Sequence, residues 1–580
     1  MKRWFKYIKP YLAYFILGPL CMVVEVIGEV LMPMCLRAVI NNSIEYGWSY
    51  PTMFAGIMTL IALTMMAGGI GGSYFGAKAS VNFAADLRQD VYTKIQRFSF
   101  ANIDKFSTGS LVTRLTNDVT QMQNVVNMAL RLAIRTPGML IGGLIMAISL
   151  NPSLSVVLAV TIPLMMISII GIILVGFSRF GKVQAKIDGL NNTVQENVTN
   201  MRVVKSFVRE DYEKGKFSTA NADLKNTGIS AFRIMIFMSP VMTLFMNVTT
   251  IAVLLIGSRM VYSSGMAVGD LSAFITYVTQ ILSSLMMVTM MLMLMSRVLA
   301  SMKRIRAVLD EELDIDDADA ADKDKTVGEG KVEFRGVSFR YYKSSPEKVL
   351  DGINLTIMPG QTVGIIGSTG CGKTTLVSMI PRLYDVDEGE VLVDGVNVKD
   401  YSLYNLREGV GMVLQKNVLF SGSIEDNLRW GNEDASIEEI EEMASYAQAD
   451  KFVKNFSGGY SYDLGQGGKN VSGGQKQRLC IARALLKKPK ILILDDSTSA
   501  VDTATEAQIR KAFREELDGS TKIIIAQRIG SVRDADMIIV MNDGRITGVG
   551  THDELLASNN EYQEIYYSQN ERESAKGGAN

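Results

Sequence analysis

Six long apolar segments in the first 300 residues constrain the fold of this chain more than any other feature. A helix needs about 20 mostly apolar residues to cross a hydrocarbon layer of ~30 Å. Segments of that kind lie at about 11–40, 53–76, 128–149, 154–177, 235–257 and 271–296. The first follows a basic start, but it is too long for a secretory signal and lacks a small-residue cleavage site. We therefore expect residues 1–309 to form an all-α transmembrane domain of six helices.

The connections between these segments alternate in length and charge. The long ones, 77–126 and 178–234, are rich in Lys and Arg and are helix-like in pattern. The opposite loops contain one basic residue, Arg259, and lie at 41–52, 150–153 and 258–270. Basic loops remain on the cytoplasmic side of a membrane. We expect a multi-pass protein of the cytoplasmic membrane whose long loops, both termini and C-terminal half are cytosolic, with helices that extend into the cytosol.

Two acidic residues lie inside the first apolar segment. Glu25 and Glu29 are four residues apart, on one face of a helix, and Arg37 follows two turns later. Ionisable residues inside membrane helices usually face a bundle interior or a wet cavity. Either the two carboxylates line a substrate path, which makes them substrate-cavity candidates, or they pair with Arg or backbone groups near the interface.

Methionine is abundant, with 34 residues that concentrate in 235–246 and 286–295. Flexible thioether side chains suit a surface that repacks around varied apolar ligands. Most such stripes serve helix–helix packing, so both interpretations remain open.

Composition excludes several classes of function. A formal net charge of −1 provides no basic field for nucleic acid, so no nucleic-acid partner is expected. The only histidine is His552, which excludes any mechanism that needs a histidine base elsewhere. The spacing of the four cysteines predicts neither a zinc site nor a disulfide framework, because no CxxC pair occurs among Cys21, Cys35, Cys371 and Cys480.

Apolar runs give way to charge after residue 309. Residues 310–330 are acidic and nearly free of large apolar groups, which indicates a solvated linker. Short β runs at Val332–Phe339 and Thr362–Ile366 then alternate with Gly-rich turns and helices, as in α/β folds with a covered parallel sheet. We expect an α/β domain at 331–568 and a polar tail at 569–580.

The predicted strand at Thr362–Ile366 leads directly into a complete GxxxxGK[ST] motif that opens a helix. Backbone N–H groups of such a loop cradle phosphates, the Lys373 ammonium reaches the β and γ phosphates, and the Thr374 hydroxyl ligates magnesium. ATP and Mg²⁺ are therefore the expected cofactors. The ATP-binding residues of the loop are Gly367, Ser368, Thr369, Gly370, Cys371, Gly372, Lys373, Thr374 and Thr375.

Two further motifs follow the phosphate loop. An apolar strand, 491–494, ends in Asp495, which is the arrangement that holds magnesium beside such a loop, although many buried strands end in Asp. Between the two motifs stands the run Ser472, Gly473, Gly474 and Gln475. This run resembles the signature of ABC ATPases. With its six apolar segments, the chain resembles an ABC exporter half-transporter over nearly its whole length.

The resemblance implies roles for other residues. Tyr341 stands where an adenine-stacking aromatic is expected, and Gln415 stands where a magnesium and water contact is expected. The implied metal ligands are thus Thr374, Gln415 and Asp495, and Asp502 belongs to the implied D-loop that follows the second strand, in the run Ser499-Ala-Val-Asp502.

The family also implies head-to-tail pairing of two such domains, with each ATP between the phosphate loop of one and the signature of the other. The signature residues 472–475 would then act on an ATP held by a partner chain. One chain is half of a pump, and the tips of its long loops, near 101–109 and 208–217, are implied to press on the ATPase domains.

Two positions depart from the family. Asp496 stands where a catalytic glutamate is usual, and Gln527 stands where a histidine is usual. Shortening a general base by one methylene misplaces its oxygen by more than ~1 Å, an error that can cost about 100-fold. The site is therefore expected to bind ATP well and hydrolyse it poorly, unless Asp496 is a tolerated replacement in a homodimer. The intact signature favours a heterodimer whose other chain has the usual residues.

These features predict ATP-driven, multidrug-type export of amphipathic or hydrophobic small molecules by the degenerate-site subunit of a bacterial heterodimer. A lipid or peptide translocator of the same architecture remains an alternative. A second alternative is an ATP-sensing regulatory subunit with little turnover.

Overall fold

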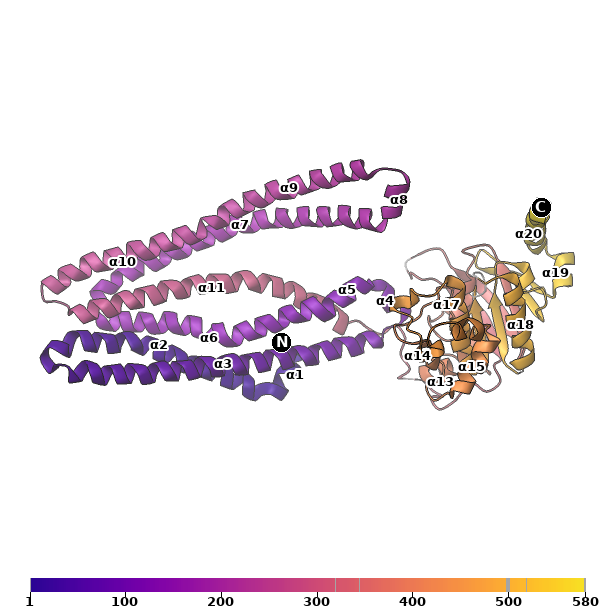
Figure 1. Ribbon diagram of the computed structural model, residues 1–580, viewed down its shortest axis with the longest axis horizontal. Helices are drawn as coiled ribbons and strands as arrows, with labels where there is room; N and C mark the ends of the chain where they lie inside the picture. Colours follow the sequence, from indigo (N-terminus) through magenta and orange to yellow (C-terminus); the bar gives the residue numbers. More distant parts are fainter. Residues whose placement is uncertain (1, 319, 344, 497–500, 518, 578–580) are drawn as a thin grey trace. The chain divides into compact units, whose positions relative to one another are not determined.

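The computed structural model describes residues 2–318, 320–343, 345–496, 501–517 and 519–577 (Figure 1). The chain divides into two compact units. The helical unit comprises Met1–Gln96 and Thr108–Glu311, and the α/β unit comprises Arg97–Ser107 and Glu312–Asn580.

The described part of the helical unit contains helices and no strands. Its elements are α1 (Lys2–Ile8), η1 (Lys9–Tyr11), α2 (Leu12–Tyr46), α3 (Ser49–Gln96), α5 (Thr108–Thr113), the π-helical turn η2 (Arg114–Asp118), α6 (Val119–Leu150), α7 (Pro152–Thr199), α8 (Met201–Ser206), α9 (Glu210–Ile236), α10 (Met238–Tyr262) and α11 (Val268–Leu309). Among the described residues, six helical stretches are long and apolar enough to cross a membrane: Arg3–Tyr46, Ser49–Gln96, Thr108–Leu150, Pro152–Thr199, Glu210–Tyr262 and Val268–Val288. The prediction of six long apolar helices is thereby confirmed.

Several of these helices are much longer than a bilayer requires. At 1.5 Å per residue, the 48 residues of α7 span about 70 Å, more than twice a ~30 Å hydrocarbon layer. α7 and α9 run side by side (Figure 1), and their polar ends are joined by ion pairs such as Lys186–Asp223, at 2.5 Å, and Lys216–Glu196, at 2.6 Å. The predicted helical extensions are therefore present.

Small residues and buried aromatics hold the bundle together. A Cβ added to Gly68 of α3 would lie 2.9 Å from the carbonyl oxygen of Cys21 in α2, so only glycine permits this close approach. Tyr277 of α11 is fully buried and donates its hydroxyl to the Val30 carbonyl at 2.6 Å. Large apolar side chains such as Leu60 and Ile167 are exposed on the helices, as expected for surfaces that face hydrocarbon.

The structure distinguishes in part between the two interpretations of the methionine-rich segments, a ligand-binding surface and helix–helix packing. Met242 is buried in the bundle core, and Met238 and Met246 pack against that core, which is the helix-packing use. In the stretch 286–295, the side chains of residues 289–295 lie outside the described residues.

The described part of the α/β unit contains two sheets. An antiparallel sheet has the order β2-β1-β4-β5, formed by β1 (Val332–Phe339), β2 (Leu350–Ile357), β4 (Glu388–Val393) and β5 (Val396–Asn397). The larger sheet has the order β10-β9-β3-β8-β7-β6 and is parallel except for β10. Its strands are β3 (Thr362–Gly367), β6 (Val410–Val413), β7 (Ile491–Asp495), β8 (Thr521–Ile525), β9 (Met537–Asn542) and β10 (Arg545–Gly550).

Helices cover the parallel sheet, and two apolar cores form around it. The helices are α12 (Lys373–Ser378), α13 (Leu403–Glu408), α14 (Ile424–Arg429), α15 (Ile437–Tyr446), α16 (Asp450–Lys454), α17 (Gly473–Leu486), α18 (Thr503–Glu516), α19 (His552–Ser558) and α20 (Asn560–Gly577), with 3₁₀ turns η3 (Gly459–Ser461), η4 (Gln466–Gly468) and η5 (Ile529–Ser531). Every residue of β7 is buried, which explains why the strand is apolar throughout up to its last residue, Asp495.

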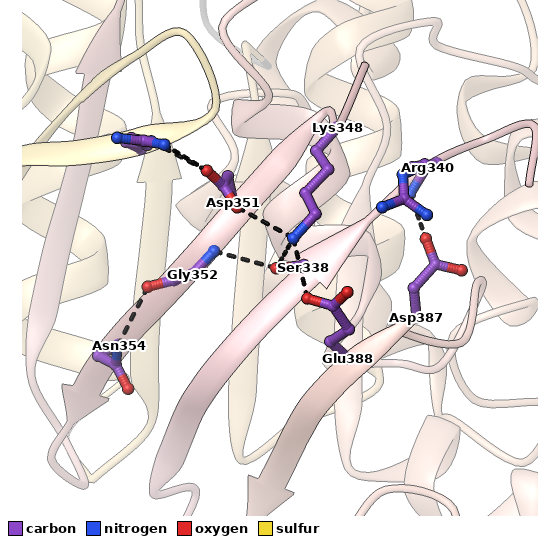
Figure 2. A network of polar contacts seen from close by, with 9 residues as sticks. Ser338, Arg340, Lys348, Asp351, Gly352, Asn354, Asp387 and Glu388 are labelled. Atoms are coloured by element: carbon purple, nitrogen blue, oxygen red, sulfur yellow. Dashed lines mark hydrogen bonds and ion pairs between the residues drawn. The ribbon is translucent and has the colours of Figure 1, made fainter. Parts of the chain in front are cut away.

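A polar network fastens the strands of the antiparallel sheet to one another (Figure 2). The Lys348 ammonium contacts Glu388 at 2.8 Å, Asp351 at 3.2 Å and the Ser338 hydroxyl at 3.2 Å. Asp351 also pairs with Arg545 of β10 at 2.5 Å. The network joins β1, β2 and β4, and Tyr341 lies between Ser338 and Lys348 in the chain.

A short helix from the first long loop, α4 (Phe100–Lys105), belongs to the α/β unit. The buried Asn102 side chain donates to the Glu312 carbonyl at 3.0 Å and accepts from the Asp314 backbone N–H at 3.2 Å. The ring of Phe100 lies 6.0 Å from that of Tyr384. The acidic segment 310–330 is thus held more firmly than its composition suggests.

Candidate nucleotide site

The phosphate loop joins the end of β3 to the start of α12 and has a backbone that requires glycine. Gly370 and Gly372 have φ values of 88° and 98°, which side chains rarely allow. A Cβ on Gly372 would also lie 2.8 Å from the Val349 carbonyl oxygen. The loop therefore packs closely against the backbone at Val349, which leaves no room for a side chain at Gly372.

Lys373 is folded onto this loop. Its ammonium donates to the carbonyls of Gly367, at 2.9 Å, and Ser368, at 2.7 Å. The positive charge therefore lies at the centre of the loop, where the motif predicts that phosphates bind.

Asp495 and Thr374 meet beside the loop. The Thr374 hydroxyl donates to one carboxylate oxygen of Asp495 at 3.0 Å, and Asp495 is 1% exposed. Burial raises the pKa of the Asp495 carboxyl above its ordinary value. The other oxygen, Oδ2, is buried and has no hydrogen-bond partner among the described residues. Such an orphaned acceptor is costly, and a hard cation that takes oxygen ligands would satisfy it.

These oxygens fit Mg²⁺ better than they fit a metal held by protein alone. Among the described residues, no group of three or more His, Cys, Asp or Glu side chains could hold a metal ion. Mg²⁺ usually binds through one or two carboxylates plus substrate phosphates, which matches a single buried carboxylate beside a phosphate loop.

The two unusual residues are in direct contact. The Gln527 amide donates to Oδ2 of Asp496 at 2.9 Å, and a second side-chain hydrogen bond reaches Asp496 from Gln415. Burial raises the pKa of the Asp496 carboxyl, while the hydrogen bonds from the two amides lower it in part. Asp496 also has a φ of 48°, which is uncommon for a residue with a side chain.

Tyr341 lies near the first turn of α12. Its hydroxyl is 2.8 Å from the Thr375 hydroxyl, and its ring packs edge-on against Tyr384, with centroids 5.2 Å apart. The side chain remains 44% exposed, which leaves a surface for a planar ligand.

The signature run supplies the N-cap and the first residues of α17. The hydrogen bonds of this cap form within the run itself. Ser472 caps the helix: its hydroxyl accepts from the Gln475 N–H at 3.3 Å, and its N–H donates to the Gln475 side chain at 2.8 Å. A capping box of this kind stabilises a helix by ~1 kcal/mol. A Cβ on Gly473 would meet no atom within 4 Å, so this helix start is open.

The remaining predicted residues lie elsewhere. Asp502 caps α18 by accepting from the Thr505 N–H at 3.0 Å, and residues 497–500, which include Ser499, lie outside the described residues. In the helical unit, Glu25 and Glu29 both contact the Arg135 guanidinium at 3.3 Å.

Sequence reasoning missed two residues of these sites. Arg135 lies inside the apolar segment 128–149, and an ionisable residue in such a segment was a usable signal. Arg37, the basic residue that followed Glu29 in sequence, instead pairs with Asp270. Gln477, buried in α17, donates to the Asp496 carbonyl at 3.3 Å, and its place two residues after the signature run was the only hint.

Comparisons with known proteins agree with this architecture. Residues 15–285 match the ABC transporter transmembrane region, and residues 350–499 match the ABC transporter family. The chain is 37% identical to the uncharacterized ABC transporter ATP-binding protein YfiB of Bacillus subtilis (strain 168), over 99% of this chain and 100% of that protein. It is 32% identical to an ATP-dependent lipid A-core flippase of Syntrophus aciditrophicus (strain SB), over 88% of this chain and 85% of the flippase.

A solved structure shares the fold. A bacterial Atm1-family ABC exporter with ATP bound superposes with a TM-score of 0.79 at 24% identity, covering 96% of this chain and 98% of the other. The family models, the relatives and the site geometry lead to one conclusion: the chain belongs to the ABC transporters and is an ATP-hydrolysing membrane transporter with its transmembrane region fused to an ABC ATPase domain.

Proposed function

We propose that this chain is half of an exporter that moves amphipathic or hydrophobic small molecules out across the cytoplasmic membrane, in a heterodimer in which its own ATP site is slow. The helical unit lies in the bilayer, and the α/β unit and both termini are cytosolic. The single observation that carries the proposal is the hydrogen bond between Gln527 and Asp496.

The phosphate loop is proposed to bind ATP through its backbone N–H groups and the Lys373 ammonium. The exposed ring of Tyr341 accepts the adenine. Thr374, Gln415 and Asp495 are the proposed magnesium ligands, and the orphaned Oδ2 of Asp495 supports this assignment. Magnesium, when bound, neutralises phosphate charge.

Asp496 is proposed to be a poor base for hydrolysis. Its side chain is one methylene shorter than glutamate, and a 1 Å error in the position of a base costs about 100-fold. Its carboxylate already accepts from the amides of Gln527 and Gln415, which makes it a weaker acceptor for a proton of the attacking water. The residues that hold ATP are thus retained, whereas the residues that would break it are altered.

The signature end of α17 is proposed to complete the ATP site of a different partner chain. A helix start with free N–H groups attracts anions, and the open surroundings of Gly473 leave room for a phosphate. In this arrangement, fast hydrolysis occurs where this chain contributes Ser472 and its partner contributes the base.

The membrane site favours a cationic or amphipathic substrate. Glu25 and Glu29 share one guanidinium, that of Arg135, so the cluster retains one negative charge when all three groups are ionised. A half-buried negative charge within a membrane helix is stabilised most when a cation meets it. This proposal keeps the substrate-path interpretation alongside the observed pairing with Arg.

The proposal is tested by ATPase activity in lipid nanodiscs. The chain alone is expected to hydrolyse MgATP at least about tenfold more slowly than the same chain co-purified with a half-transporter that has Glu and His at the two altered positions. Robust magnesium-dependent turnover by a homodimer of this chain would refute the heterodimer.

Lipid translocation is a second candidate, because a relative at 32% identity is an ATP-dependent lipid A-core flippase. The two candidates differ in their cargo. Proteoliposomes that flip a fluorescent lipid but do not transport a cationic dye would favour the lipid, and the opposite result would favour small-molecule export.

A further inference from the structure

The C-terminal helix α20 makes two hydrogen bonds to the loop that carries Gln527. The side-chain oxygen of Gln569 accepts from the Ile529 N–H at 2.9 Å, and its amide donates to the Gln527 carbonyl at 2.8 Å. One glutamine therefore binds the backbone on both sides of residue 528. Two bonds from one side chain restrict the loop in orientation as well as in position.

The contact continues to the proposed slow site. Gln527 donates its own side-chain amide to Asp496, so Gln569, Gln527 and Asp496 form a continuous chain of hydrogen bonds. The far side of the loop has other supports: the Ala526 N–H donates to the Ile365 carbonyl at 3.2 Å, and the Arg510 guanidinium donates to the Gly530 carbonyl. Gln569 supplies the support on the α20 side.

The helix that carries Gln569 is itself anchored. Tyr562 is fully buried, and its hydroxyl is 2.7 Å from Nδ1 of His552 in α19. The Glu561 carboxylate accepts from the Asn542 amide of β9 at 2.9 Å. Gln569 lies seven residues after Tyr562, which places both on one helix face. The anchored first turn therefore directs Gln569 toward the Gln527 loop.

We propose that Gln569 is a positioning residue for this nucleotide site: it fixes the backbone of Gln527 so that the Gln527 amide remains on Asp496. The inference rests on the proposed function for the roles of Asp496 and Gln527. It assigns a function to residue 569, where a polar tail was expected to begin. Undocking of α20 would release the loop and shorten the time for which nucleotide is retained.

The test measures release of mant-ATP, with Mg²⁺, from the full-length chain in nanodiscs. Gln569→Ala is expected to release the nucleotide about threefold to tenfold faster, the range that follows from the loss of one or two hydrogen bonds. Gln569→Glu keeps the acceptor for the Ile529 N–H but cannot donate to the Gln527 carbonyl, so it is expected to behave like Gln569→Ala.

Gln563→Ala is the matched control. This glutamine belongs to the same helix but donates to the Leu556 carbonyl at 2.8 Å, so its loss is expected to leave release unchanged. Thermal unfolding of both alanine variants separates a general loss of helix docking from a specific effect on the site.

A double-mutant cycle distinguishes positioning from a merely structural role. In a Gln527→Ala background, Gln569→Ala is expected to add no further change, because its effect passes through Gln527. The proposal would be overturned if Gln569→Ala released mant-ATP at the wild-type rate, or if the effects of the two changes multiplied. A wild-type chain that binds no mant-ATP would also overturn it. The heterodimer proposal is tested by a different measurement, the ATPase rates of the chain alone and of the assembled pump.

Discussion

The phosphate loop and the signature run are both helix starts in one α/β unit, yet they differ in how they are built. α12 is preceded by a loop with glycines in left-handed conformations, and next to it Asp496 and Gln527 contact each other in place of the usual pair. α17 begins with a capping box and open space, with no unusual residue. In the proposed function, one domain keeps the residues that bind nucleotide at both helix starts and loses hydrolytic chemistry at only one of them.

The largest effect is expected from the signature end. Gly473→Glu places a bulky negative charge where a partner's ATP phosphate would bind, and it should reduce ATPase activity of the assembled pump by about 100-fold or more. Because a Cβ added at Gly473 would meet no atom within 4 Å, we expect the fold to tolerate the change. Gly473→Ala is the matched control and should lose far less. A Gly473→Glu pump that retains most of its activity would contradict the assignment.

Asp495→Asn tests the proposed magnesium site beside the phosphate loop. Mg²⁺ binds the ionised carboxylate, so the neutral amide should weaken Mg²⁺-dependent nucleotide binding by about tenfold, as measured by titration of mant-ATP with Mg²⁺. Asp351→Asn, in the network of Figure 2, is the control and should bind normally. Unchanged Mg²⁺ dependence would remove Asp495 from the metal ligands.

The pH dependence of this site has a defined sign. Because burial raises the pKa of Asp495, the nucleotide-free folded state binds more protons than the unfolded state. That contribution to stability is complete below the ordinary value of 3.8 and is lost as pH rises through the raised pKa. MgATP affinity should show the opposite trend and fall on acidification. Asp495→Asn should reduce both trends and leave the part that comes from Asp496, whose pKa burial also raises. Thermal unfolding with and without MgATP checks them.

Sequence reasoning predicted what depends on local pattern and missed what depends on long-range pairing. The apolar segments and the phosphate-loop motif are continuous in sequence, so the six spans and the strand–loop–helix around Lys373 were visible. The contact of Asn102 with the backbone of 312–314, by contrast, joins segments about 210 residues apart. No periodicity reports which polar side chain finds which distant carbonyl, and the same holds for Arg135 and Gln569.

A smaller effect is expected from Lys373→Ala. The ATP that this lysine contacts lies in the proposed slow site. ATP bound there is proposed to hold the ATPase domains of the two chains together, while its hydrolysis adds little to total turnover. We expect about a fivefold loss of ATPase activity in the assembled pump, well short of the Gly473→Glu loss. Lys451→Ala, on the exposed surface of α16, is the control. Equal losses from Lys373→Ala and Gly473→Glu would indicate two equivalent sites.

The smallest expected change is a gain, from Asp496→Glu combined with Gln527→His. The double variant restores the longer carboxylate and removes the amide that donates to it at 2.9 Å. Total turnover should rise by about twofold at most, because a second competent site can only add to the first. The backbone opposes the gain, since the new glutamate must keep a φ of 48°.

Each single change should give little: glutamate alone would still face Gln527, and histidine alone would still face the short aspartate. Steady-state ATPase rates and mant-ATP release should therefore be measured together. Faster nucleotide release together with faster ATPase turnover would show that geometry limits the site. No increase in either rate would mean that the limit lies outside the Asp496–Gln527 pair.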